Sequence, residues 1–200
     1  MKKIITIGRQ FGSGGREVGQ KIAQALHIAY YDKELLAVAA KKSGLSSQFM
    51  NTYDEKPTRS FLYSLVMGQR GLFSDSAEAT VEQLAANAQR DAILAVAGEG
   101  SCVIVGRCAD HILRNEQGLL RVFLTADHGD RIQRICRRDS VTTAEAEEKL
   151  QRMDRSRAAY YRFRCDQTWG AAANYDLCIN VSRWGVDAAV ETIVERCGRA

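Results

Sequence analysis

The residues most able to bind a charged ligand form the glycine-rich stretch from Gly8 to Gly15, which holds four glycines in eight residues. Glycine lets a backbone turn through positive φ and brings N–H groups close to an anion. A helix that begins behind such a loop adds the positive end of its dipole. A plain turn needs fewer glycines, and a dinucleotide fingerprint starting at Gly12 would need glycine where Glu17 stands. We therefore predict a phosphate-binding loop. The residues expected to contact a nucleotide there are Gly8, Arg9, Gly12, Ser13, Gly14, Gly15 and Arg16.

The loop departs from the pattern G-x-x-x-x-G-K-[ST] at two positions. After the last glycine of the pattern comes a lysine that reaches the β- and γ-phosphates, followed by a hydroxyl that binds Mg²⁺. Here Gly14 is followed by Gly15 and Arg16. Arg16 or Arg9 can supply the charge, with a planar guanidinium in place of an ammonium. We assign this role to Arg16, because it opens the helix beside the glycines, and Ser13 is the alternative source of the hydroxyl.

Basic residues cluster at two places further along the chain, from Arg131 to Arg138 and from Arg152 to Arg164. Such clusters suit a small phosphate-rich ligand. The alternative is that they are solvated helix faces held by ion pairs. The formal charge of +4 is modest and the basic residues form no single long run, so we predict no nucleic-acid partner.

Other kinds of site find little support in the residue pattern. His27, His111 and His128 lack the mutual spacing of a metal site or a triad, and the six cysteines include no C-x-x-C pair. No serine stands in G-x-S-x-G, which argues against a hydrolase of that class. We therefore expect no metal ligated by a cluster of side chains.

The chain also lacks membrane and export signals. No stretch approaches the roughly 18–20 apolar residues that span a bilayer. Lys2 and Lys3 are followed by only four residues, Ile4 to Ile7, before Gly8, which is too short a stretch for a signal peptide. We expect a cytoplasmic protein with small-molecule nucleotide partners and no membrane partner, and we leave its oligomeric state open.

The candidate residues must be positioned by alternating strands and helices. Short apolar runs typical of strands buried on both faces occupy residues 4–7, 102–105, 120–124 and 177–181. Helical spacing or caps predict helices after the glycine loop and at 32–42, 75–96, 127–138, 142–164 and 186–197. Strands separated by helices of this length favour a parallel sheet covered on both faces.

Several details of these elements follow from individual residues. Val18, Ile22, Ala25 and Leu26 form the expected buried face of the first helix. Capping boxes are predicted for Asp75 with Glu78 and for Thr142 with Glu145. Cys102 and Cys178 lie in apolar runs, where a thiol packs as a small hydrophobe. The whole chain, 1–200, is expected to be one domain, with a mobile excursion at about 44–74.

With these residues in view, the chain resembles the cytidylate kinase-like branch of the nucleoside monophosphate kinases along nearly its whole length. The loop pattern of that branch, G-R-x-x-G-S-G-G, matches Gly8 to Gly15. Three further segments match in the same order. They are Arg90-Asp91-Ala92-Ile93-Leu94, Val105-Gly106-Arg107 and Asp154-Arg155-Ser156-Arg157-Ala158.

The resemblance implies an α/β fold of the three-layer P-loop kinase type, with about five parallel strands, helices on both faces and a helical lid at about 139–165. Residues 29–31 are the candidate fifth strand. It further implies ATP and Mg²⁺ as cofactors. The implied acceptor-binding residues are Asp32, Arg90, Gly106 and Arg107. The implied catalytic residues are Arg155 and Arg157, and Arg16, to which we assign the charge of the missing lysine, completes the predicted catalytic set.

The function that follows is ATP-dependent phosphoryl transfer to a nucleoside monophosphate, CMP-like, or a similar small phosphorylated acceptor. Two departures bear on the acceptor: Asp32-Lys33-Glu34 replaces the family's D-S-G, and Cys108 replaces the aspartate of G-R-D. These two departures leave open the alternative that the protein is a kinase of a non-nucleotide metabolite. The missing lysine leaves open a regulatory protein that binds nucleotide without catalysis. Tyr160, Tyr161 and Trp169 are predicted to be packing residues rather than base stackers.

Overall fold

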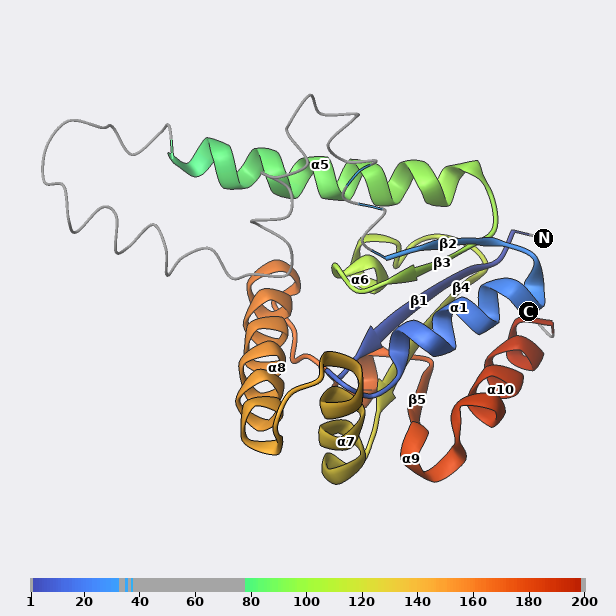
Figure 1. Cartoon of the computed structure of the whole chain (residues 1–200). Helices are drawn as coiled ribbons and strands as arrows, with labels where there is room; N and C mark the ends of the chain where they lie inside the picture. The colour runs from blue at the N-terminus through green and yellow to red at the C-terminus, as the bar shows by residue number, and fades with distance from the viewer. Residues whose placement is uncertain (1, 33–34, 36, 38–77, 199–200) are drawn as a thin grey trace, which may run out of the picture.

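The computed structural model describes residues 2–32, 35, 37 and 78–198 (Figure 1). The excursion predicted at about 44–74, most of the helix predicted at 32–42, and Asp75 of the first predicted capping box lie outside these residues.

A five-stranded parallel sheet forms the centre of the molecule, in the order β2-β3-β1-β4-β5. The strands are β1 (Ile4–Arg9), β2 (Ala29–Tyr31), β3 (Cys102–Val105), β4 (Leu119–Thr125) and β5 (Leu177–Asn180). β1 pairs with both β3 and β4, so the glycine loop that follows it leaves from the middle of the sheet. The predicted parallel sheet, with the strand at 29–31 as its fifth member, is confirmed.

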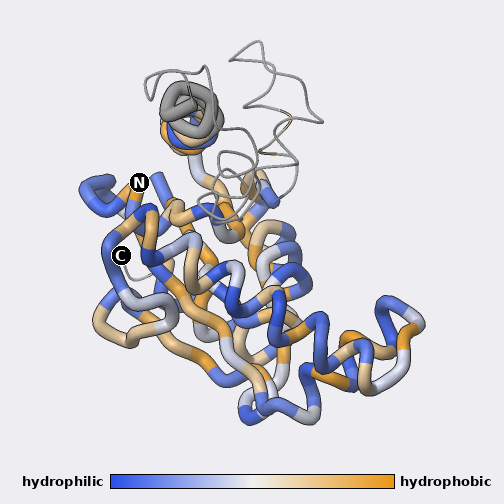
Figure 2. The backbone as a smooth tube through the Cα atoms, turned by 90° about the vertical axis from the view of Figure 1, so that its left-hand side faces the viewer, coloured by the Kyte–Doolittle hydropathy of each residue, from blue (hydrophilic) through white to orange (hydrophobic). Residues whose placement is uncertain are grey.

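Helices cover both faces of this sheet (Figure 1). On one face, α5 (Glu78–Glu99) and α6 (Ala109–Ile112) pack on side chains such as Ile4 and Ile104. On the other, α1 (Gly15–Leu26) and α10 (Val186–Gly198) pack on Ile5 and Ile7. Successive residues of a strand point to opposite faces, so β1 contributes to both cores. Hydrophobic and hydrophilic residues alternate along the helices (Figure 2), as expected of helices with one buried side.

Two predicted packing residues are exposed instead. Ala25 of α1 faces solvent, and Ala23 takes the buried place beside Val18 and Ile22. Cys178 is exposed because it alternates with the buried Ile179 along β5, the strand at the edge of the sheet. Cys102, in the inner strand β3, is buried as predicted.

The remaining elements lie at the carboxyl end of the sheet or connect its strands. α7 (His128–Asp139) and α8 (Thr143–Cys165) follow β4. A 3₁₀ turn (Ala172–Asn174) precedes β5, and the short α9 (Val181–Trp184) follows it, so residue 181 belongs to a helix rather than to the predicted strand. In the described part of the chain, none of the helices is long and apolar enough to span a membrane.

The predicted capping box of Thr142 and Glu145 starts α8. The Thr142 hydroxyl accepts a hydrogen bond from the Glu145 N–H at 3.3 Å, and the Glu145 carboxylate accepts one from the Thr142 N–H at 2.9 Å. Both bonds satisfy N–H groups that a helix start leaves without intrahelical partners. The Thr142 N–H and the Thr142 hydroxyl, the latter at 2.7 Å, both donate to the Glu145 carboxylate, and these two bonds lower its pKa.

We expect Thr142→Ala to lower the free energy of unfolding by about 1 kcal/mol, because it removes the acceptor for the Glu145 N–H. Urea denaturation followed by circular dichroism measures this loss. Thr143→Ala, one residue into the helix, is the matched control and should change stability by less than about 0.5 kcal/mol. Equal losses in the two variants would contradict the role of the cap.

Candidate functional site

The glycine loop bends back on itself where β1 passes into α1. Gly12 and Gly14 have φ values of 80° and 86°, a conformation that disfavours side chains. A Cβ on Gly12 would also lie 2.9 Å from the Arg131 carbonyl oxygen. The first intrahelical bond runs from the Val18 N–H to the Gly14 carbonyl at 3.0 Å. The amides of residues 15–17 therefore form the open helix start that favours an anion.

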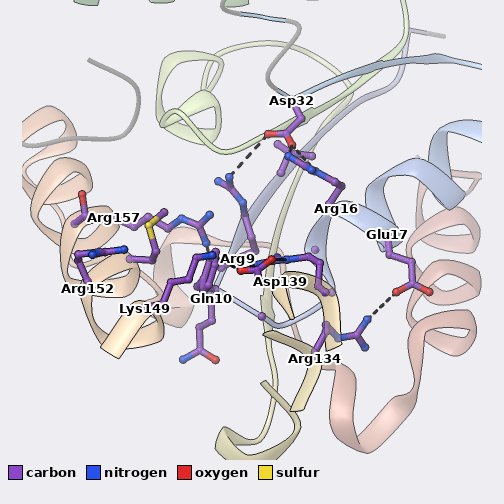
Figure 3. A pocket seen from close by; sticks show the side chains of 18 of the residues that line it. Arg9, Gln10, Arg16, Glu17, Asp32, Arg134, Asp139, Lys149, Arg152 and Arg157 are labelled. Atoms are coloured by element: carbon purple, nitrogen blue, oxygen red, sulfur yellow. Dashed lines mark hydrogen bonds and ion pairs between the residues drawn. The ribbon is translucent and has the colours of Figure 1, made fainter. Parts of the chain in front are cut away.

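A large cavity of about 1220 Å³ lies over this loop and is lined by residues from the loop, α1, α7 and α8. Its wall carries eight arginines and one lysine: Arg9, Arg16, Arg107, Arg134, Arg137, Arg138, Arg152, Arg157 and Lys149. The acidic residues of the wall are Glu17, Asp32 and Asp139. Such an excess of fixed positive charge in a cleft attracts a polyanion. Figure 3 shows Arg9 near the middle of the cavity, with Lys149, Arg152 and Arg157 on the α8 side.

At the end of β2, the Asp32 carboxylate lies within 4.0 Å of three of these arginines. Its Oδ2 accepts from Arg16 Nε at 2.9 Å and lies 2.7 Å from Arg16 Nη2. Its Oδ1 accepts from Arg107 Nη1 at 3.3 Å, while Arg9 Nη2 lies 4.0 Å away. Asp32 is only 5% exposed, so its charge acts through a poorly screened medium. It balances part of the positive charge and holds the guanidinium groups in fixed positions.

A second carboxylate, Asp154 of α8, holds the loop itself. Its Oδ1 accepts from the Phe11 N–H at 2.8 Å, and its Oδ2 accepts from Arg131 Nη2. The Nε of Arg131 donates in turn to the Phe11 carbonyl at 2.7 Å. Arg131 and Asp154 thus bind both backbone polar groups of one loop residue. Arg131 is 5% exposed and points at the loop, so it is a structural member of the predicted 131–138 cluster.

The side chain of Phe11 also attaches the glycine loop to α7 and α8. It packs with Ile132, Ile135 and Leu150 of α7 and α8 in a small apolar core. The guanidinium carbons of Arg138 and Arg157 lie 4.8 Å and 5.6 Å from the centre of its ring, within the range of cation–π attraction. The phosphate loop and the two helices above it are therefore joined by one aromatic residue.

The cavity side of α8 is set by helical spacing. Lys149, Arg152 and Arg157 line the cavity, whereas Arg155 is exposed and is absent from the wall. Arg157 Nη1 also donates to the Arg9 carbonyl at 3.1 Å. On the same cavity wall, hydrogen bonds from Arg138 and Lys149 hold the pKa of Asp139 well below its usual range.

The structure brings most of the predicted site residues together. Arg9, Gly12, Gly14, Gly15, Arg16, Asp32, Arg107 and Arg157 line the large cavity. Gly8 and Gly106 line a small adjoining cavity of about 20 Å³, which also touches Arg9, Arg107 and Arg157.

Three predicted site residues line neither of these two cavities in this conformation. Arg90 is exposed on α5, and Arg155 is exposed on α8. Ser13 is fully buried, and both its hydroxyl, at 2.9 Å, and its N–H, at 3.3 Å, donate to the Gln10 carbonyl. That carbonyl stabilises the turn of the loop, so the Ser13 hydroxyl does not fit the position of a Mg²⁺ ligand.

The basic residues of the wall to which the sequence assigned no individual role are Arg134, Arg137, Arg138, Lys149 and Arg152. For the four arginines the sequence signal was the clustering of basic residues, which cannot tell a cavity face from a solvated face, and Lys149 lies outside both clusters. Arg134 is paired with Glu17 at 2.7 Å across the loop (Figure 3). In the described ranges, no group of three or more His, Cys, Asp or Glu side chains is placed to hold a metal ion.

Aromatic side chains behind the loop are packed. The Tyr160 hydroxyl donates to Gln89 at 2.8 Å, and the Tyr161 hydroxyl donates to Asp110 at 2.6 Å. Burial raises the pKa of Asp110, and the hydrogen bond from Tyr161 partly opposes that shift. Trp169 meets Phe123 edge to face, with ring centres 5.4 Å apart. These contacts agree with packing rather than base stacking.

A parallel sheet with a glycine loop between its central strand and α1, and a cationic cavity over that loop, defines the class of P-loop kinases. Among solved structures, the shikimate kinase from Bacteroides thetaiotaomicron shares this fold, with a TM-score of 0.55 at 16% identity and 99% of both chains covered. The chain belongs to the cytidylate kinase-like family, whose model matches residues 4–183.

Two proteins that are similar in sequence carry the name cytidylate kinase. The cytidylate kinase of Methanopyrus kandleri is 24% identical over 212 residues, covering 96% of this chain and 95% of that protein. The cytidylate kinase of Pyrococcus horikoshii is 27% identical over 203 residues, covering 97% and 89%. An uncharacterised protein from Eubacterium ventriosum has a solved structure with a TM-score of 0.74 at 28% identity, and the match covers 100% of both chains.

We expect Asp154→Ala to lower the free energy of unfolding by about 3 kcal/mol, because it leaves the buried Arg131 guanidinium without its carboxylate. Urea denaturation measures the loss. Glu148→Ala, an exposed carboxylate on the same helix, is the control and should change stability by less than about 0.5 kcal/mol. A loss below about 1 kcal/mol in Asp154→Ala would contradict the role of the pair.

Proposed function

We propose that the protein transfers the γ-phosphoryl group of ATP to a nucleoside monophosphate, CMP-like in its chemistry. The observation that carries this proposal is the cavity itself, in which nine cationic side chains surround a glycine loop at the start of a helix. Phosphoryl transfer asks little covalent chemistry of a protein. It requires the donor and acceptor to be held in line while positive charge stabilises the migrating group.

The donor phosphates are proposed to lie against the amides at the start of α1. Gly12 and Gly14 allow the loop to turn there, and Arg134 and Arg138 approach from α7. ATP therefore fits the residues present. Mg²⁺ would supply charge neutralisation between phosphate oxygens, and it often binds mainly through phosphates and water. We assign it no side-chain ligand.

The acceptor phosphate is proposed to bind at Arg107, which follows β3 as the resembling kinases require. The side chain of Arg107 is 1% exposed and is held by Asp32 and by the Val105 carbonyl at 3.1 Å, so its position is fixed before a ligand arrives. Gly106, which lines the adjoining cavity, is proposed to let the acceptor approach the backbone. Arg90 is exposed on α5 and is proposed to join the acceptor only when that helix moves inward.

The migrating group is proposed to be stabilised by the arginines of α8. Arg157 already faces the cavity and is tied to the loop through the Arg9 carbonyl. Arg155 faces solvent in this conformation, so its proposed catalytic role requires a further closing movement of α8 as a lid. Arg16 is proposed to contribute to the charge at the opposite wall, where it is paired with Asp32.

A coupled assay of ADP release from ATP, run over a panel of nucleoside monophosphates, tests the proposed activity. We expect turnover to be highest with a pyrimidine monophosphate such as CMP. Turnover with shikimate-like hydroxy acids or other phosphorylated metabolites, but not with nucleotides, would favour the metabolite kinase. ATP binding by calorimetry without turnover on any acceptor would favour the regulatory alternative.

We predict that Arg157→Ala lowers kcat at least tenfold, about 1.4 kcal/mol in transition-state stabilisation, with an unchanged circular dichroism spectrum. Arg155→Ala measures whether α8 closes: a comparable loss supports the lid movement, and unchanged kcat would remove Arg155 from the catalytic set. Arg114→Ala, which changes an exposed arginine bonded to the His111 carbonyl, is the control and should leave kcat unchanged. Full activity in Arg157→Ala would contradict the role assigned to it.

A further inference from the structure

The backbone conformation of Gly15 does not explain why this residue is a glycine. It is the first residue of α1, and its φ lies outside the positive range that excludes side chains. Glycine is a poor helix former, so an ordinary helix start would favour almost any other residue. A Cβ built on Gly15, however, would lie 2.8 Å from both Cβ and Cγ of Arg9. These are the first carbons of that side chain, which cannot move aside without moving the loop.

The position that Arg9 blocks is the one at which a P-loop carries its lysine. In G-x-x-x-x-G-K-[ST] the lysine follows the last glycine, here Gly14, and reaches the β- and γ-phosphates. A lysine at position 15 and an arginine at position 9 would occupy the same space. The two residues are therefore alternatives, and this chain has the arginine.

The surroundings of Arg9 suit the role of that lysine. Its side chain is 12% exposed and lines the cavity beside the glycine loop (Figure 3). The peptide unit that follows Arg9 is fixed by two hydrogen bonds: its carbonyl accepts from Arg157, and the Gln10 N–H donates to the Leu124 carbonyl at 3.0 Å. Its guanidinium lies 4.0 Å from Asp32, a longer approach than that of its neighbours.

Arg16, to which we had assigned the missing charge, is placed differently. Two of its nitrogens lie within 2.9 Å of one oxygen of Asp32, and its side chain is 57% exposed. A guanidinium held in this way must break a close ion pair before it can bind a phosphate. The first carbons of the Arg9 side chain, in contrast, lie against Gly15 at the start of α1.

We infer that Arg9 replaces the missing lysine, with its guanidinium binding the β- and γ-phosphates of the nucleoside triphosphate in the space that a residue-15 side chain would fill. This inference rests on the proposed function, because it places ATP on the glycine loop. The planar guanidinium group of arginine can donate to oxygens of two neighbouring phosphates at once, whereas the ammonium group of lysine acts as a point charge.

The steric half of the inference can be tested without any ligand. Gly15→Ala should lower Tm by roughly 2–10 °C in the wild-type background, because the added methyl overlaps the Arg9 side chain. In the Arg9→Ala background the same substitution should leave Tm unchanged or raise it, since alanine favours the helix. Equal changes of Tm in the two backgrounds would overturn the inference.

The functional half of the inference is tested by moving the positive charge from residue 9 to residue 15. Arg9→Ala should weaken binding of a non-hydrolysable ATP analogue at least tenfold by calorimetry, and Gly15→Lys alone should not improve binding. The double variant Arg9→Ala with Gly15→Lys should bind more tightly than Arg9→Ala, because the lysine then has both the space and the position. Arg114→Ala is the control. Unchanged affinity in Arg9→Ala, or no recovery in the double variant, would overturn the inference while the proposed function stands; a wild type that binds no ATP analogue would overturn both.

Discussion

The attachment of Phe11 to Asp154 and Arg131 is the interaction on which the site depends. The glycine loop has few side chains of its own with which to hold a shape. One carboxylate and one guanidinium from α7 and α8 fix both backbone groups of Phe11, and its ring is packed between the same helices. The wall that carries most of the arginines is thereby joined to the phosphate loop, although these segments lie more than a hundred residues apart in the sequence.

A site with so much positive charge must also be stable without its ligand. Asp32, Asp139 and Glu17 are each paired with arginine or lysine side chains of the cavity wall. These ion pairs offset the mutual repulsion of the cations and limit the conformations they sample. A polyanion that enters the cavity therefore meets groups that are already positioned, which reduces the ordering cost of binding.

Much of the fold could be predicted from the sequence, because strands buried on both faces and helices with caps leave local patterns. The runs at 4–7 and 102–105 and the capping box of Thr142 needed only neighbouring residues to be recognised. Cys178 was predicted to be buried and is exposed, because an apolar run does not tell which face of an edge strand is covered.

Within the site, the glycine loop was predictable and the separate tasks of its arginines were not. Spacing along α8 places Arg155 and Arg157 two residues apart, and only the orientation of the helix decides that Arg157 faces the cavity. Arg131 belongs to a basic cluster but binds the loop backbone. The contact between Arg9 and Gly15 joins residues on either side of a turn, and no periodic pattern records it.

The choice of arginine over lysine in the cavity wall has a chemical consequence of its own. Eight of its nine cationic side chains are guanidinium groups, which stay protonated at any pH at which a protein is folded. Lys149 alone among the nine bears a primary amine, the group that acetylation neutralises. The attraction of this cavity for phosphate is therefore nearly constant in alkaline solution, and modification of lysine can remove only a small part of it. In an ordinary P-loop the central cation is a lysine, so alkaline solution and acetylation can each remove the positive charge at the position that matters most.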